Sequence, residues 1–68
     1  MHLSRVNTQS LMLQLSENEL LIFKSCLREV FATLDRNEFS LRVGAPIEIV
    51  ASLAEELTKQ MQVMGIEE

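Results

Sequence analysis

The side chains that could do chemistry in this chain are few and widely separated. Cys26 is the one cysteine and His2 the one histidine, so together they form the only thiol and imidazole pair available. A catalytic thiol needs a neighbouring base and an electropositive, partly open setting. Because Cys26 lies at the margin of an apolar helical stripe, we interpret it as a small hydrophobic side chain.

The acidic residues give no better basis for catalysis. Glu55 and Glu56 are adjacent on one predicted helix, so their carboxylates point in different directions and fit a solvated face better than a general acid and base pair. One cysteine and one histidine leave no credible zinc ligand set, and no phosphate-binding glycine loop is present. We therefore expect a non-enzymatic protein with no cofactor and no metal.

Length and charge narrow the class of partner. A chain of 68 residues forms at most one small domain, and small domains need extra burial from disulfides, a metal or another subunit. With a single cysteine, we expect a homodimer.

The formal net charge of −4 argues against nucleic acid and anionic lipid as partners. No apolar run approaches the ~20 residues that span a bilayer, and no signal peptide is visible, so we expect a cytoplasmic protein without a membrane partner.

Two long helices are predicted from apolar periodicity. Ser16 and Glu19 form a capping box that predicts the start of a helix over 16–35. A second long helix is predicted over 46–64, with Pro46 at an early position and Gly44 before it. A short helix is expected over 38–43. The predicted inner faces consist of Leu20, Phe23, Leu27, Val30, Phe31 and Leu34, and of Val50, Leu53, Ala54, Leu57, Met61 and Met64.

Residues 1–15 differ from the rest of the chain. Leu11, Leu13 and Leu15 recur with a period of two, which predicts a half-buried strand. Its mate is either His2–Val6 of the same chain, folded back through NTQS, or the same segment of another protomer. Because NTQS lacks glycine, we favour a ribbon between subunits. A disordered leader or an extra helical turn stays as an alternative. The expected fold is mainly α, a three-helix bundle with a short N-terminal β-strand.

Residues 39–53 have the spacing of a helix-turn-helix. Ser40 occupies the small position and Gly44 the turn glycine, and the apolar packing positions are Phe39, Val43, Ala45, Val50 and Leu53. The segment thus resembles the helix-turn-helix family, which implies that the start of the last helix would face DNA. At those positions only Glu48 and Ser52 can make polar base contacts, and Glu48 would repel phosphate. A helix-turn-helix transcriptional regulator is therefore our second reading, and we expect no nucleic-acid partner.

Three short motifs lie between residues 15 and 57. They are a helix start of Leu15, Ser16, Glu19 and Leu20, a step of Leu27, Glu29 and Val30, and a turn of Phe39, Arg42, Gly44 and Ala45. In these motifs the chain resembles a group of small bacterial proteins with no assigned activity. The resemblance implies a bacterial cytosolic origin and brings no catalytic residues.

These observations favour a protein–protein interaction module. We expect an acidic protein that binds a second copy of itself, or a basic or apolar protein surface, as antitoxins, immunity proteins and regulatory adaptors do. Met61 and Met64 fit ordinary core packing best, and packing against a second protein or a second copy is the alternative. The candidate interaction surface comprises Leu11, Leu13, Ile22, Cys26, Met61 and Met64.

Overall fold

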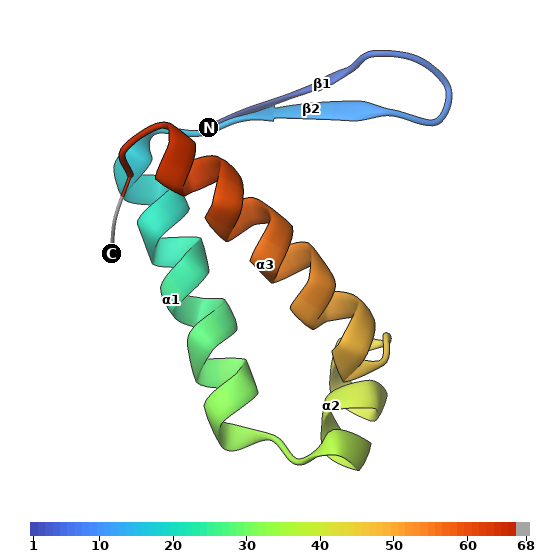
Figure 1. Cartoon of the computed structure of the whole chain (residues 1–68). Coiled ribbons are helices and arrows are strands. Elements are labelled where there is room, and N and C mark those ends of the chain that lie inside the picture. Colours follow the sequence, from blue (N-terminus) through green and yellow to red (C-terminus); the bar gives the residue numbers. More distant parts are fainter. Residues whose placement is uncertain (67–68) are drawn as a thin grey trace.

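The computed structural model describes residues 1–66 as a β-hairpin followed by three helices (Figure 1). The elements are β1 (His2–Arg5), β2 (Leu11–Gln14), α1 (Glu17–Thr33), α2 (Arg36–Val43) and α3 (Ile47–Val63). The expectation of a mainly α chain with a short N-terminal β segment is confirmed.

The predicted capping box starts α1. The Ser16 hydroxyl accepts a hydrogen bond from the backbone N–H of Glu19 at 3.1 Å, and the Ser16 backbone N–H donates to Glu19 Oε1 at 2.9 Å. Two otherwise unpaired donors at the helix start are thereby satisfied. The first helical residue is Glu17, one position after the cap.

The short helix is longer than expected. It begins at Arg36 because the Asp35 carboxylate accepts from the backbone N–H of Glu38 at 2.8 Å and so acts as an N-cap. The polar residues after α1 therefore start a new helix as well as ending the previous one. Within this helix, Arg42 forms an ion pair with Glu38, four residues earlier, at 3.3 Å.

A left-handed glycine connects α2 to α3. Gly44 has φ of 83°, a conformation that other L-residues rarely adopt, and its N–H donates to the Ser40 carbonyl. Pro46 follows as the N-cap of α3, with ψ of 147°. The sequence predicted Pro46 inside the helix, but the first helical residue is Ile47. This connection gives α2 and α3 the tight turn that the spacing predicted.

The two strands pair with each other within one chain. Our prediction that β2 pairs with the same segment of another subunit is therefore wrong. β1 and β2 are antiparallel, with Leu3 opposite Leu13 and Arg5 opposite Leu11. Asn7 stabilises the turn although the loop contains no glycine. Its side-chain oxygen accepts from the backbone N–H of Gln9 at 2.9 Å, and the Val6 N–H donates to the Ser10 carbonyl at 3.0 Å.

The three helices lie in one open layer. The C-terminal end of α3 lies beside the start of α1, the two helices diverge from there, and α2 closes the wide end (Figure 1). The Cα extents are 33 × 32 × 18 Å, and the radius of gyration is 13.5 Å, against about 11 Å for a compact chain of this length.

The core is confined to the corners of this layer. Among residues 1–66, the buried hydrophobic side chains are Phe39, at 0% exposure, and Met61, at 4%. Phe39 stacks on Phe31 of α1 with a centroid separation of 5.2 Å. Leu53, Met64 and Phe23 were predicted on inner faces but are exposed, because each apolar stripe is wider than the area that the neighbouring helix covers.

Candidate protein-interaction surface

The structure divides the predicted interaction residues into three groups. Leu11 and Leu13 lie on β2 and are exposed. Ile22 and Cys26 lie one turn apart on α1 and are also exposed. Met64 is exposed, but Met61, near the C-terminal end of α3, is buried, so Met61 is not part of an available surface.

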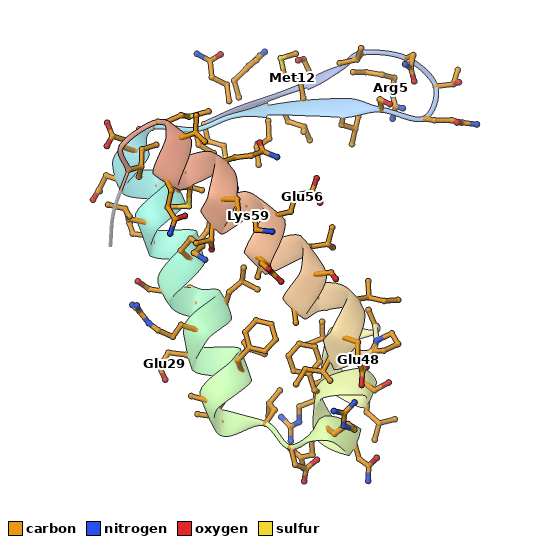
Figure 2. All side chains as sticks on the ribbon, viewed as in Figure 1. Arg5, Met12, Glu29, Glu48, Glu56 and Lys59 are labelled. Atoms are coloured by element: carbon orange, nitrogen blue, oxygen red, sulfur yellow. The ribbon has the colours of Figure 1, made fainter. Side chains whose placement is uncertain are left out.

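Ile22 and Cys26 form the floor of a shallow, mainly apolar hollow on the outer face of α1. Ser25 and Glu29 complete its lining, and its volume is about 490 Å³. Glu29 points away from α3 at the edge of the molecule, as its label in Figure 2 shows. We call Ile22, Ser25, Cys26 and Glu29 the outer face of α1.

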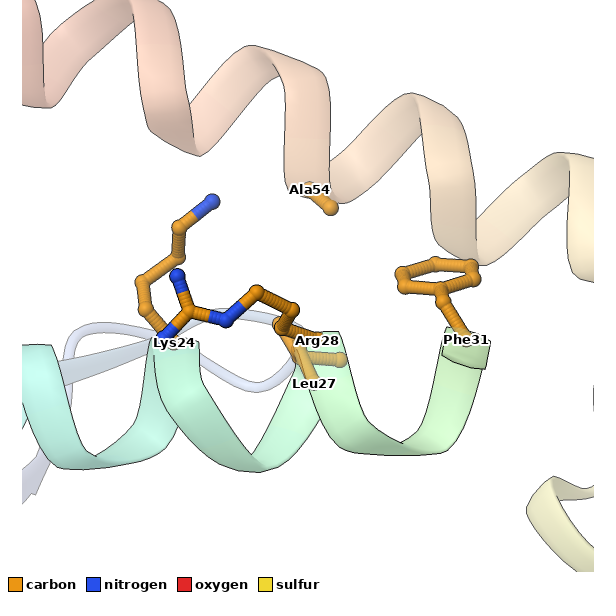
Figure 3. Close-up of a pocket in the computed structure, with 5 residues that line it drawn as sticks. All are labelled: Lys24, Leu27, Arg28, Phe31 and Ala54. Carbon is orange, nitrogen blue, oxygen red and sulfur yellow. The ribbon is translucent and has the colours of Figure 1, made fainter. Parts of the chain in front are cut away.

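A second hollow separates α1 from α3 (Figure 3). This groove has a volume of about 310 Å³ and an apolar floor with two basic side chains at one end. Its lining residues are Lys24, Leu27, Arg28, Phe31 and Ala54. The spacing of Lys24 and Arg28, four residues apart, places both on one flank of α1, but the sequence does not show that α3 lies far enough from α1 to leave a groove.

A polar contact bridges this groove. Lys24 Nζ donates to Thr58 Oγ1, and the Thr58 hydroxyl in turn donates to the Ala54 carbonyl at 2.8 Å. A hydrogen bond therefore joins the two helices where a hydrophobic contact would be expected in a closed bundle. This hydrogen bond limits how far α1 and α3 can separate. It does not fill the space between the two helices.

The two candidate DNA-facing residues lie on the exposed side of α3. Glu48, labelled in Figure 2, forms an ion pair with Arg36 of α2. Ser52 is exposed one turn later on the same helix. The carboxylate that would have to meet a base edge is thus paired with the cation of the preceding helix. Further along α3, Glu55 pairs with Lys59 at 3.4 Å.

The imidazole of His2 and the thiol of Cys26 lie at different sites. His2 lines a hollow at the root of the hairpin together with Gln14, Ser16 and Glu19, whereas Cys26 lines the outer face of α1. Within residues 1–66, no three His, Cys, Asp or Glu side chains are grouped to hold a metal ion. Over the same residues, no helix has the length and apolar character needed to cross a bilayer.

The pKa of Glu19 lies below its ordinary value. The main cause is the hydrogen bond that its carboxylate accepts from the Ser16 backbone N–H, followed by its interaction with the Ser16 hydroxyl, and the amino group of Met1, 3.4 Å away, acts in the same direction. The carboxylate thereby joins the root of the hairpin to the start of α1. These contacts give Glu19 a structural role.

Comparison of the chain with protein-family models, curated proteins and solved structures finds no match. The resemblances to helix-turn-helix proteins and to small bacterial proteins therefore stay predictions. The functional argument depends on the surface itself.

Proposed function

We propose that this chain is a non-enzymatic protein–protein interaction module, an acidic cytoplasmic protein that acts by covering, or being covered by, an apolar protein surface. The observation that carries the proposal is its surface area. The chain exposes 5546 Å², whereas a compact monomer of 7.8 kDa exposes about 4,400 Å². The excess is about 1,100 Å² on one chain, which is of the size that one partner buries in a specific protein–protein contact.

The composition of this surface supports a protein partner. Large hydrophobic side chains are exposed on every element, including Leu3 and Leu13 on the hairpin, Ile22 on α1 and Leu53 on α3. A monomeric protein seldom leaves so much apolar surface in contact with water unless another surface covers it. The net charge of −4 favours an apolar or basic partner. Among known classes, a regulatory, antitoxin or immunity-type protein fits this description best.

The alternative, a helix-turn-helix DNA-binding regulator, is supported by the turn at Gly44 and the helices on either side of it. The charge of α3 argues against it. Glu48 and Glu55 lie on the face that would approach the phosphates, and the nearest cations, Arg36 and Lys59, are already paired with them. Specific DNA binding depends on several cationic contacts with the phosphates.

Photo-crosslinking in cells tests the proposal. Ile22 on the outer face of α1 is replaced by the photoreactive residue benzoylphenylalanine, and Lys59 on the charged side of α3 is replaced in the control. We expect a protein adduct from position 22, either with a second copy or with another protein, and at least tenfold less from position 59. No adduct from position 22, or equal yields from both, would contradict an interaction module.

Fluorescence anisotropy with random duplex DNA separates the two candidate functions. We expect no binding at 50 mM salt, because α3 presents paired carboxylates to the duplex. Binding that weakens about a thousandfold between 50 and 200 mM salt is the behaviour of a protein that neutralises several phosphates. That result would favour the DNA-binding regulator.

A further inference from the structure

We infer that the partner is a second copy of this chain, and that each copy lays the apolar face of its hairpin on the outer face of the other copy's α1. The inference rests on the proposed function and specifies its partner. It joins two surfaces that the structure leaves exposed at opposite sides of the same chain.

The first surface is one face of the hairpin. Residues directly opposite each other in an antiparallel pair share a face, and successive residues alternate between faces. Leu3, Leu13, Leu11 and Arg5 therefore lie on one face, which we call the leucine face, while Ser4 and Met12 lie on the other. All eight strand residues are exposed. A two-stranded hairpin alone is marginally stable in water, so a covering surface would stabilise it.

The second surface is the outer face of α1. Ile22 and Cys26 offer an apolar floor for leucine side chains, and Glu29 adds a carboxylate at one end of it. Arg5 adds a cation at the tip end of the leucine face. The two surfaces thus match in apolar character and carry opposite charges at their ends, which favours one relative orientation.

The two surfaces cannot meet within one chain. The hairpin projects from the start of α1 across the side on which α3 lies, whereas Glu29 points to the opposite edge (Figures 1 and 2). A twofold axis brings them together twice, because each copy gives a hairpin and receives one. A foreign partner would have to supply both complementary surfaces itself.

The amount of exposed surface fits this arrangement. Burying the excess of about 1,100 Å² on each chain gives a total near 2,200 Å², at the lower end of the range for obligate homodimers. The hairpin contact is the part of this interface that the sequence pattern specifies best.

Disulfide trapping tests the contact with the cysteine that the chain already has. In Leu13→Cys, the new thiol lies on the leucine face and should approach Cys26 of the other copy closely enough for oxidation by diamide to join them. We expect a covalent dimer on a non-reducing gel. Because Leu13 is exposed, the substitution leaves the helices intact, which circular dichroism verifies.

Two matched variants locate the bond. Met12→Cys places a thiol on the opposite face of the same strand, so it should yield at least tenfold less covalent dimer. Leu13→Cys combined with Cys26→Ser should lose the dimer that Leu13→Cys forms. Equal yields from positions 12 and 13, or dimer that persists without Cys26, would overturn the proposed contact.

The outcomes also separate this inference from the proposed function. If the purified Leu13→Cys variant stays monomeric while position 22 crosslinks to a different protein in cells, the second copy is the wrong partner and the interaction module stands. If neither experiment gives an adduct, both proposals fail.

Discussion

Phe39 is the residue on which the helical layer depends most. Its side chain, on α2, is fully buried and stacks on Phe31 of α1, so this ring contact joins α2 to α1. Met61, near the C-terminal end of α3, is the second buried hydrophobic side chain of the described residues. The remaining apolar side chains are partly or largely exposed, which makes these two positions disproportionately important.

Phe39→Ala should therefore destabilise the chain by about 3–5 kcal/mol, the usual cost of removing a buried aromatic ring. Since a domain this small has little stability to spare, we expect loss of helical circular dichroism at room temperature. Leu41→Ala is the control, because Leu41 lies on the same helix and is 84% exposed. It should change the free energy of unfolding by less than about 0.5 kcal/mol. Equal losses at the two positions would contradict the packing.

Glu19 predicts a pH dependence of stability. Because its pKa is lowered in the folded chain, its charged form stabilises the fold above its ordinary value of 4.5, and this contribution is lost as the pH falls through the lowered pKa. Glu19→Gln keeps a capping side chain but removes the charge. We expect the variant to be less stable than the wild type at pH 7 and equally stable well below pH 4.5, as measured by urea unfolding. A difference independent of pH would refute the role of the charge.

At the scale of the elements, the helices could be predicted and the mate of the strand could not. The capping box at Ser16, the apolar periodicity and Gly44 are local signals, and they gave the helix positions to within about two residues. The hairpin was misjudged because its turn uses the Asn7 side chain in place of glycine. Asn7, at the second position of the loop between β1 and β2, was the signal that could have revealed it.

Gly44 allows a direct test of the turn between α2 and α3. An added Cβ would meet no atom within 4 Å, but φ of 83° is unfavourable for alanine. Gly44→Ala should cost about 1–2 kcal/mol, and Gly44→Asn should cost less because asparagine tolerates this conformation better. Thermal unfolding of both variants measures the difference. If alanine were as stable as glycine, the turn would not have the conformation described.

At the scale of the whole molecule, the chain is an incomplete layer. Periodicity identified which faces of α1 and α3 are apolar, but it could not show that one chain covers only part of them, because coverage depends on how far the helices separate. For the interaction surface, too, periodicity identified apolar residues but could not show which of them stay exposed. Ile22 and Cys26 were predicted and lie together, whereas Met61 proved to be core and the groove beside Lys24 was missed.

The central claim is that this layer is completed by a second copy. Sedimentation equilibrium of the unmodified chain at micromolar concentration tests it most directly, since the method measures mass without regard to shape. We predict twice the chain mass of 7.8 kDa, falling towards the monomer when Leu11 and Leu13 are both replaced by serine. A mass of 7.8 kDa for the unmodified chain at every concentration would contradict the account.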